Sequence, residues 1–158
     1  MTHLEIIQLA AGAAGCVGFG FLYNLRKSFL PLAAIGGFLS WLVYLLTSHW
    51  LFSGIFLPTL TASFATAVYA EILARICHAP STPFFLTSVL PLVPGSTLYY
   101  CIDALVQNEG GNAKQYGIDT FLYALAISAG MAIAWTICDM VRKIQKAERD
   151  LKERHRTL

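Results

Sequence analysis

The residues that are best suited to bind a ligand are the six from Pro91 to Ser96, PLVPGS. They interrupt an otherwise apolar stretch at residues 82–106. Pro91 and Pro94 each lack a backbone N–H and crowd the carbonyl four residues earlier, so a helix is expected to break there. In lipid, the backbone groups that such a break frees need protein or water partners. Transporters use broken helices to present helix ends and bare carbonyls to a substrate. A proline kink that serves only helix packing is the alternative, because proline and glycine are common in transmembrane helices.

Four residues at the break are candidates for substrate binding, namely Pro94, Gly95, Ser96 and Tyr99. A helix that begins near Gly95 and Ser96 offers free N–H groups and the positive end of its dipole, which suit an anionic carboxylate. Tyr99 follows Ser96 by three residues and shares roughly its helix face. Its hydroxyl is therefore expected either to reach the same ligand or to bond to a neighbouring helix.

Three charged residues, Glu71, Arg75 and Asp103, are candidates for a gate or for ion coupling. Glu71 follows Leu51 by about 30 Å of helix, which places it at the inner edge of the membrane. Arg75 follows Glu71 at i+4, so an interfacial ion pair is expected, and a cytoplasmic substrate gate is the functional alternative. Asp103 lies about 12 Å beyond Gly95, toward the outer face. No acid is expected at mid-membrane, where proton-coupled transporters usually carry one. Coupling would then be absent, be supplied by a partner, or use Asp103 through a wet vestibule.

Metal and cofactor chemistry has no basis in the sequence. The cysteines and histidines are scattered singly, without metal-ligand spacing: Cys16, Cys77, Cys101, Cys138, His3, His49, His78 and His155. No nucleophile elbow, zinc-protease helix or phosphate-binding glycine loop is present, and no histidine or lysine is placed at the depth of Ser96 to activate it. We therefore expect no metal site, and neither hydrolase nor ATPase chemistry has a basis in the sequence.

The elements that must position these residues are membrane helices. Hydrophobic residues make up 56% of the 158 residues and charged residues only 13%, whereas soluble domains carry roughly a quarter charged residues. The first apolar stretch has no basic residues ahead of it, so it is expected to be retained and not cleaved as a signal peptide. Windows of about 20 apolar residues predict an all-α membrane protein with five spans: Leu4–Tyr23, Leu30–Thr47, Leu51–Ala74, Pro83–Val106 and Tyr116–Val141.

Positive charge predicts the orientation of these spans. With the N-terminus outside and the C-terminus in the cytoplasm, all Lys and Arg residues except Lys114 lie inside. This basic face accounts for the net charge of +2 and would attract anionic membrane lipid, and it does not indicate nucleic-acid binding. Residues 1–141 then form the membrane domain, and residues 142–158 form a charged cytoplasmic tail that is expected to be helical.

Small residues recur at helical spacing on three of the expected spans, where they let helices approach closely. Contacts within the chain could use all of these faces, or one face is left for a partner subunit or a second copy in a higher oligomer. Three tryptophans are typical of the aromatic belt at membrane interfaces. The small residues are Ala11, Ala14, Gly15 and Gly18, then Ala62, Ala65, Thr66 and Ala70, then Ala126, Gly130 and Ala134, and the tryptophans are Trp41, Trp50 and Trp135.

Together these features resemble the membrane half of the threonine/serine exporter family. The resemblance is carried by the five spans, Asn24 with its basic loop, the run Phe64–Arg75, the pair Ala79-Pro80, and above all the segment Pro91–Ser96. It extends to about Arg142 and leaves the tail out. In one-chain members this region is similar to the C-terminal five-span half. Here it stands alone, as in split members that pair a small protein with a larger one.

The resemblance implies a subunit of a two-component exporter in the bacterial inner membrane, which would export threonine and serine or a C4 dicarboxylate such as succinate. It implies a larger multi-span exporter-family subunit as partner, and no cofactor. Together with the helix break, it predicts that this chain supplies part of the substrate site and that the partner supplies the rest. The alternative is a membrane scaffold or assembly subunit that transports nothing and whose proline break is only a packing kink.

Overall fold

A computed structural model describes the backbone of residues 3–51 and 54–156 and, within these ranges, the side chains up to residue 148. The described chain contains helices and no strand. In chain order the helices are α1 (His3–Leu22), the short 3-10 helix η1 (Lys27–Phe29), α2 (Leu30–Trp50), α3 (Phe56–Cys77), α4 (Ser81–Ser88), the 3-10 helix η2 (Leu90–Leu92), α5 (Gly95–Val106) and α6 (Gly110–Arg156).

Four described helices are long and apolar enough to cross a membrane: α1, α2 together with η1, α3 and α6. The segments Ser81–Ser88 and Leu90–Val106 pass the same test as a pair bent by 41°, which gives up to five spans. The expected third span, Leu51–Ala74, was placed too early, because α2 continues to Trp50 and α3 begins only at Phe56. Residues 52–53 of that expected span lie outside the described residues.

A residue with a left-handed backbone conformation follows three of the helices. Asn24 with φ 52° follows α1, His78 with φ 50° follows α3, and Asn108 with φ 58° follows α5. Asn and His adopt this backbone region more readily than branched side chains do. After α3, the N–H of Ala79 reaches back to the carbonyl of Ala74 at 3.1 Å. Such ends let the chain reverse within a few residues and place consecutive helices next to each other.

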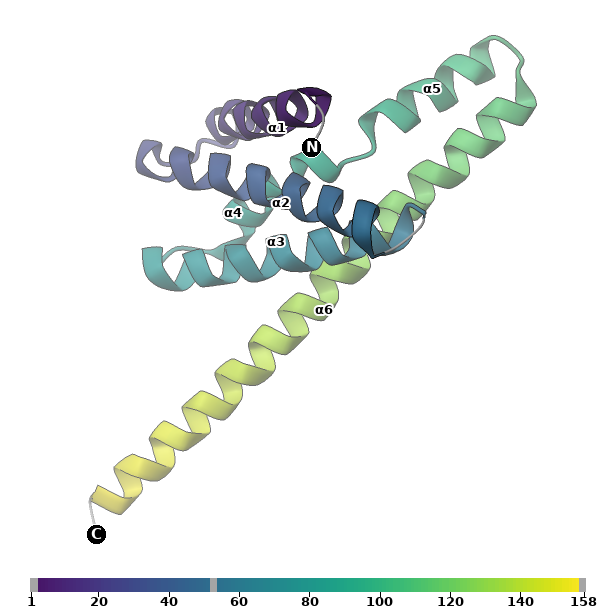
Figure 1. Cartoon of the computed structure of the whole chain (residues 1–158). Coiled ribbons are helices and arrows are strands. Elements are labelled where there is room, and N and C mark those ends of the chain that lie inside the picture. Colours follow the sequence, from purple (N-terminus) through teal and green to yellow (C-terminus); the bar gives the residue numbers. More distant parts are fainter. Residues whose placement is uncertain (1–2, 52–53, 157–158) are drawn as a thin grey trace.

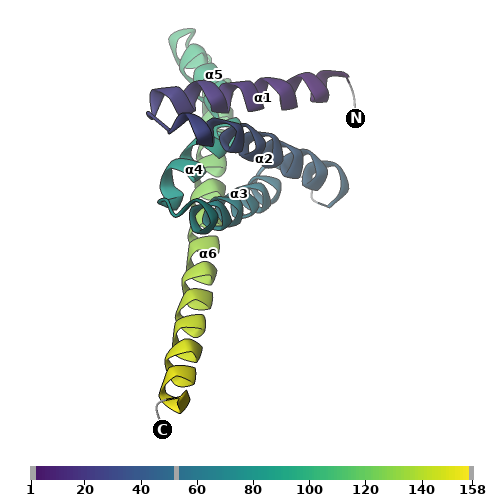
Figure 2. The ribbon, with the colours of Figure 1, turned by 90° about the vertical axis from the view of Figure 1, so that its left-hand side faces the viewer.

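Helices α1, α2 and α3 lie side by side, as Figures 1 and 2 show. Gly37 of α2 lies against Cys16 of α1, so that an added Cβ would collide with the sulfur. The Tyr69 hydroxyl of α3 donates a hydrogen bond to the Leu32 carbonyl of α2 at 2.8 Å. Cys16 is late in α1 and Gly37 is in the first half of α2, whereas Leu32 is early in α2 and Tyr69 is late in α3. Helix α2 is therefore antiparallel to both α1 and α3.

The long helix α6 crosses α3 obliquely and extends beyond the bundle at both ends (Figure 2). The Ser63 hydroxyl of α3 donates to the Ile127 carbonyl of α6 at 2.7 Å, and a Cβ on Gly130 would lie 2.6 Å from a backbone carbonyl oxygen of α3. Ala126 and Ala134 are fully buried on the same face. The small-residue face of the fifth expected span is therefore used within the chain.

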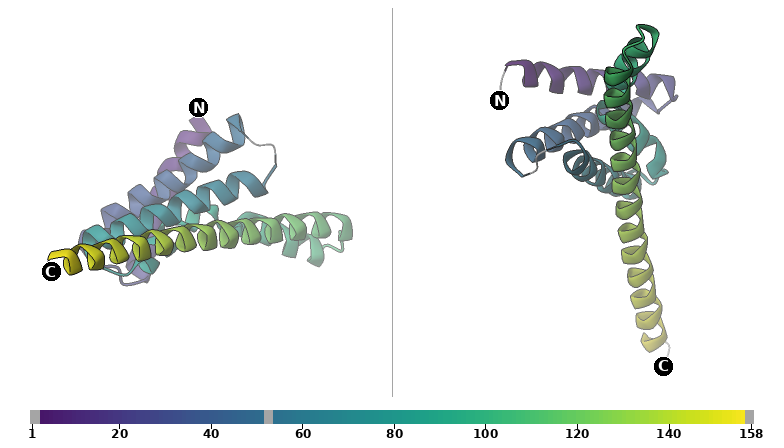
Figure 3. Two further views of the ribbon diagram at one scale, coloured as in Figure 1. Left: turned by 90° about the horizontal axis from the view of Figure 1, so that it is seen from below. Right: turned by 90° about the vertical axis from the view of Figure 1, so that its right-hand side faces the viewer.

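Helix α5 runs antiparallel to the first part of α6, and the two form a hairpin that Figures 1 and 3 show apart from α1 and α3. The Thr120 hydroxyl donates to the Thr97 hydroxyl at 3.0 Å, and the Cys101 thiol donates to the Ala113 carbonyl at 3.3 Å. The hairpin therefore holds the start of α5, and with it the helix break, at a fixed place beside α6.

The small-residue face of α1 is not used in the same way. Gly15 and Gly18 have nothing within 4 Å of an added Cβ, and α1 contacts α2 through other residues, such as Cys16. The residues of this face are all exposed: Ala11, Ala14, Gly15 and Gly18. We refer to them as the α1 small face.

Candidate functional site

The helix that contains the proline segment is interrupted between Ser88 and Gly95. α4 ends at Ser88, and Val93 is extended with φ −63° and ψ 127° before α5 begins at Gly95. Inside the interruption, the N–H of Val93 bonds to the carbonyl of Leu90 at 3.1 Å, and the N–H of Gly95 bonds to the carbonyl of Val93 at 2.8 Å. Pro94, which lacks an N–H, is the residue before α5. The two prolines thus convert one helix into two with a tight turn between them.

The first turn of α5 carries N–H groups without helical acceptors. No side chain caps this helix, although the first four N–H groups of an α-helix have no intrahelical partner. Among the backbone bonds of the described loops and caps, Leu98 donates to the Pro94 carbonyl at 3.1 Å, and none comes from Ser96 or Thr97. The start of α5 therefore presents a partial positive charge and free donors.

A cavity of about 80 Å³ lies at this end of α5, and we call it the break cavity. Its walls come from three helices besides the turn itself. α2 contributes Trp41 and Tyr44, α6 contributes Tyr123, and α5 contributes Ser96. The hydroxyls of Tyr44 and Tyr123 lie 3.2 Å apart in a hydrogen bond, and the Trp41 ring stacks on Tyr44 with ring centroids 5.0 Å apart. The cavity is therefore lined by aromatic rings that carry polar groups.

Several buried polar atoms near the break lack a hydrogen-bond partner in the described part of the chain. The indole nitrogen of Trp41, which lines the break cavity, is one of them. The hydroxyls of Ser40 and Ser88 are two others, and both residues are fully buried. Ser88 ends α4 and lies against Gly36 of α2. Because buried polar groups are nearly always hydrogen-bonded, these atoms mark a region that water or a ligand group would satisfy.

The donors around the break cavity suit an anionic oxygen. An indole N–H and the free N–H groups of a helix start donate only, and the hydroxyls of Ser96 and the two tyrosines can also donate. A volume of about 80 Å³ holds a few water molecules, and so a carboxylate group but not a whole metabolite. Within the described residues, no three His, Cys, Asp or Glu side chains are placed to hold a metal ion.

An apolar hollow of about 300 Å³ lies on the other side of the turn, between the break and α1. Its walls include Gly95 and Val93 from the break, and Gly15 and Phe19 from α1. Gly95 lines this apolar hollow, whereas Ser96 lines the break cavity. The two hollows share Pro91 and Val93 in their walls. Neighbouring residues at the start of α5 thus lie on two faces of one turn.

Tyr99 and Asp103 lie away from both hollows. Tyr99 is 64% exposed and its ring packs edge-on against Tyr100 at 5.6 Å. Asp103 is about one turn further along α5 than Tyr99, and its carboxylate accepts a hydrogen bond from the Gln107 amide at 2.8 Å. Of the four residues predicted to bind substrate, Pro94 and Ser96 line the break cavity, Gly95 lines the apolar hollow, and Tyr99 lines neither.

The expected ion pair between Glu71 and Arg75 was wrong. In the described structure the Glu71 carboxylate accepts a hydrogen bond from the Arg142 guanidinium of α6 at 3.0 Å. The Glu71 side chain is 10% exposed and that of Arg142 is 62% exposed. The i+4 rule treats α3 as an isolated helix, whereas the crossing of α3 and α6 brings Arg142 to the buried carboxylate. Arg75 instead lines an open hollow beside Arg142.

Trp41, Tyr44 and Tyr123 were not predicted as site residues. Trp41 was expected at the membrane interface, but it lies in the middle of α2 and stacks inside the bundle. The two tyrosines carried a usable signal, because each places a hydroxyl inside an apolar span and buried tyrosine hydroxyls usually find a partner. Their meeting across α2 and α6 could not be read from either helix alone.

Residues 8–137 match the family model described as threonine/serine exporter, ThrE. The matched range includes the break, both hollows and the crossing of α3 with α6. The chain belongs to the threonine/serine exporter family. No curated protein and no solved structure shows significant similarity to it. Membership in this exporter family and the long apolar helices together identify a membrane protein of the transport class.

Proposed function

We propose that this member of the threonine/serine exporter family is the small subunit of a two-component transporter in the bacterial inner membrane. Its cargo is a small carboxylate metabolite, threonine and serine or a C4 dicarboxylate such as succinate. The chain moves its cargo and does not transform it, so it is not an enzyme and uses no cofactor. The larger subunit is a multi-span member of the same family.

The observation that carries this proposal is the uncapped start of α5 at the break cavity. A carboxylate placed there would accept hydrogen bonds from the free N–H groups of Ser96 and Thr97 and would lie at the positive end of the helix dipole. Trp41, whose buried indole nitrogen has no hydrogen-bond partner in the described part of the chain, lines the same cavity. A kink that served packing alone would not need polar groups left without partners beside it.

The two hollows would bind different parts of a small metabolite. The break cavity takes one carboxylate, and the apolar hollow on the other face of the turn takes carbon atoms of the cargo. Gly95 lines the apolar hollow without a side chain and has open space around it. The cargo would therefore lie against the turn, near Ser96 and Gly95.

The exposed α1 small face supports the need for a second subunit. Gly15 belongs to this face and also lines the apolar hollow. A helix of the larger subunit that packed on Ala14 and Gly18 would approach closely, because small residues permit short backbone distances. It would then cover the apolar hollow and complete the site. A second copy of this chain could occupy the same face, which would give a higher oligomer.

The chain directions support five crossings, and the distribution of basic residues supports an N-terminus outside. Consecutive spans alternate when α4 and α5 are counted as one span bent by 41°. α3 and α6 run the same way, since Ser63 meets Ile127 and Glu71 meets Arg142. α4 runs the same way as α2, because Phe29, just before α2, packs on Phe84 with ring centroids 5.3 Å apart, and Gly36 meets Ser88 further along. With the basic residues inside, the Glu71–Arg142 pair would then stand at the cytoplasmic end as a gate. Asp103, toward the outside, remains the candidate for coupling.

Reconstitution tests the two-component proposal directly. Efflux of threonine or succinate is measured from loaded proteoliposomes that contain this chain, the larger subunit, or both. We expect efflux only with both chains. Efflux from this chain alone, at a rate that the larger subunit does not change, would contradict the proposal, and efflux from the larger subunit alone at the full rate would favour the scaffold function instead.

The variant Ala14→Leu tests the docking face. A leucine on the α1 small face should hold the partner helix away, and we expect the yield of co-purified larger subunit to fall several-fold. Ala132→Leu is the matched control, because Ala132 is also exposed in an apolar helix but lies on α6. Equal co-purification of the two variants would remove the α1 small face from the interface.

A further inference from the structure

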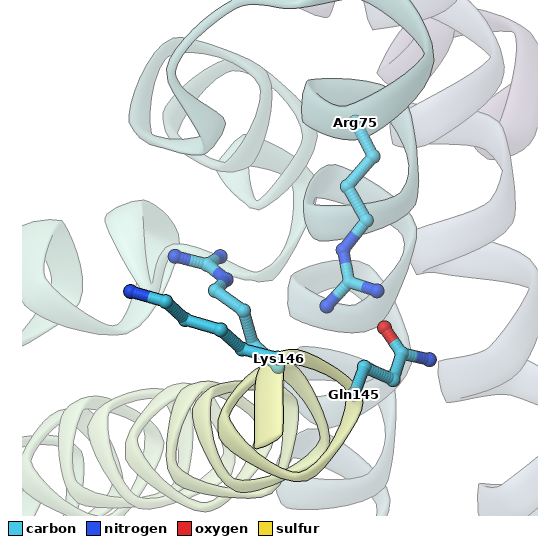
Figure 4. Close-up of a pocket in the computed structure, with 4 residues that line it drawn as sticks. Arg75, Gln145 and Lys146 are labelled. Carbon is cyan, nitrogen blue, oxygen red and sulfur yellow. The ribbon is translucent and has the colours of Figure 1, made fainter. Parts of the chain in front are cut away.

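Two adjoining hollows lie where α3 ends beside α6, away from the break. The first has a volume of about 460 Å³ and is lined by Arg75, Arg142, Gln145 and Lys146. Figure 4 shows Arg75 reaching from α3 toward α6, where Gln145 and Lys146 lie. The second, of about 380 Å³, shares Arg75 and Arg142 with the first and extends to Glu71 and the start of α4. We refer to the two together as the basic hollow.

The charges that line the basic hollow do not balance. Arg142 is paired with Glu71, and Glu71 is the only carboxylate among the described lining residues. Arg75 and Lys146 form no ion pair within the described part of the chain. Cations that converge on one space repel each other, so the hollow carries a positive potential that an anion would relieve.

The start of α4 adds backbone donors to the same space. Ser81 and Thr82 line the second hollow, and α4 begins at Ser81 after Pro80 with no side-chain cap. The N–H groups of this first turn and the dipole of α4 therefore point their positive end toward the arginines. Arg75 and Arg142 also offer planar guanidinium groups, which match the geometry of carboxylate and phosphate oxygens.

We propose that the basic hollow is a second anion site, specific for an oxyanion group, held by Arg75, Lys146 and the start of α4. The group is either the carboxylate of the cargo on its way to the break or the phosphate of an anionic lipid headgroup. The cargo source rests on the proposed function, whereas the lipid source does not. In either case Arg142 stays paired with Glu71, and its guanidinium group lines the site as a second one beside that of Arg75.

The basic hollow is separate from the break cavity. α4 separates them, since Ser81 stands at one end of this helix and Ser88 at the other, about 10 Å apart. No residue lines both the basic hollow and the break cavity. An anion bound at the basic hollow would therefore reach the break only after passing along α4, which suits a first binding step at the cytoplasmic end.

Anion-dependent thermal stability of the purified full chain tests this site. The unfolding midpoint is followed by far-UV circular dichroism in detergent while succinate, inorganic phosphate or short-chain phosphatidylglycerol is added. Sodium chloride at equal ionic strength and short-chain phosphatidylcholine serve as blanks. We expect at least one oxyanion to raise the midpoint saturably, because a ligand that binds only the folded state stabilises it. In Arg75→Gln and Lys146→Gln, the half-saturating concentration should rise roughly three- to tenfold for each charge removed.

Lys143→Gln is the matched control. Lys143 lies on the same helix beside Arg142, carries the same charge, and is paired with Asp139 at 2.9 Å outside the hollow. Its removal should leave the half-saturating concentration unchanged. If no oxyanion acts saturably, or if Lys143→Gln weakens the effect as much as Arg75→Gln does, there is no specific site.

The three additives distinguish the source of the oxyanion. Saturation by succinate or inorganic phosphate identifies a soluble ligand, and saturation by phosphatidylglycerol alone identifies a lipid headgroup. The measurement needs no transport, so it separates this site from the proposed function. A chain that binds oxyanions here but never supports efflux would refute the exporter proposal and leave the anion site standing.

Discussion

Ser96 and Thr97 stand next to each other at the start of α5 but have different surroundings. Ser96 lines the break cavity. The Thr97 hydroxyl is already engaged, since it donates to the Pro94 carbonyl at 3.2 Å and accepts from Thr120 at 3.0 Å. One hydroxyl is therefore available for a ligand, whereas the other holds α5 to the turn and to α6.

Ser96→Ala should weaken the apparent affinity for cargo by about tenfold to a hundredfold, because a hydrogen bond to a charged group contributes roughly 1.5–3 kcal/mol. The unfolding midpoint should hardly change, since no side chain caps α5. Thr97→Val should do the reverse and lower stability by about 1 kcal/mol. Both are checked by the concentration dependence of efflux and by thermal unfolding. Unchanged affinity in Ser96→Ala would show that its hydroxyl is not a ligand.

The pair between Glu71 and Arg142 predicts an asymmetric response. Arg142→Gln leaves a carboxylate that is 10% exposed without its partner, whereas Glu71→Gln leaves a guanidinium that is 62% exposed and can turn to water. Breaking a pair costs most when the charge left behind is buried. We expect Arg142→Gln to lower the free energy of unfolding by about 2 kcal/mol and Glu71→Gln by about 1 kcal/mol or less.

Chemical unfolding in detergent measures this difference. Arg75→Gln is the control, because it removes the same charge from an exposed side chain without an ion pair in the described structure, and it should change stability by less than about 0.5 kcal/mol. Equal losses for Glu71→Gln and Arg142→Gln would mean that burial of the carboxylate does not set the cost.

At the scale of single residues, the sequence predicted the position of the helix break but only some of the residues that line the break cavity. The backbone chemistry of Pro91, Pro94 and Gly95 is local, so it can be read from neighbouring residues. Trp41 and Tyr123 come from other helices, and their approach depends on how α2 and α6 pack. The Glu71–Arg142 pair has the same origin, because it joins residues 71 apart in sequence.

The crossing of α3 and α6 depends on a close approach of the two helices at Gly130. A Cβ on Gly130 would lie 2.6 Å from a backbone carbonyl oxygen of α3, a position from which the helices must move apart. Gly130→Ala should therefore lower the free energy of unfolding by about 1–3 kcal/mol.

Gly117→Ala on the same helix is the control for this prediction. There an added Cβ would make an ordinary contact of 3.5 Å with the Cys101 sulfur, and alanine favours a helix by roughly 0.5–1 kcal/mol over glycine. We expect Gly117→Ala to be neutral or stabilising when both variants are unfolded thermally. A loss in Gly117→Ala equal to that in Gly130→Ala would show that the close approach at Gly130 is not the cause.

Apolar windows located the helices but not all of their ends. The fifth span was expected to begin at Tyr116, whereas α6 begins at Gly110, and Gly110 and Gly111 lie in its first turn, where the N–H groups need no helical partner. Asn108, in the left-handed region, makes the reversal instead. α6 then continues as one helix to Arg156, which agrees with the prediction of a helical tail.

At the scale of the whole molecule, the alternating spans and the distribution of basic residues together predict which ends face outside. Lys114 near the start of α6 should be outside and Gln145 near its far end inside. Single cysteines at these positions, in a background without other reactive thiols, are treated with a membrane-impermeant thiol reagent in intact cells. We expect labelling at position 114 and none at 145 until the cells are opened. Labelling at 145 in intact cells would reverse the orientation.

The sequence shows which helix faces carry small residues, but it does not show which of these faces pack against another helix. Spacing alone showed three faces that permit close contact. The structure uses Gly130 and its neighbours between α3 and α6 and leaves Gly15 and Gly18 exposed. Which face meets another helix depends on the rotation of each helix in the bundle, and this information is spread over the whole chain.

Efflux by a Gly95→Leu complex is the most direct test of whether the helix break binds cargo. Gly95 has nothing within 4 Å of an added Cβ, so the leucine can be accommodated, yet it would fill the apolar hollow where cargo is expected to lie. Gly111→Leu is the matched control, because its surroundings are equally open and it lies at the start of α6. Both are assayed in loaded proteoliposomes that contain the larger subunit, with monodispersity checked in parallel. We expect Gly95→Leu to abolish efflux and Gly111→Leu to retain it, whereas normal efflux by a well-folded Gly95→Leu complex would show that the break is only a packing kink.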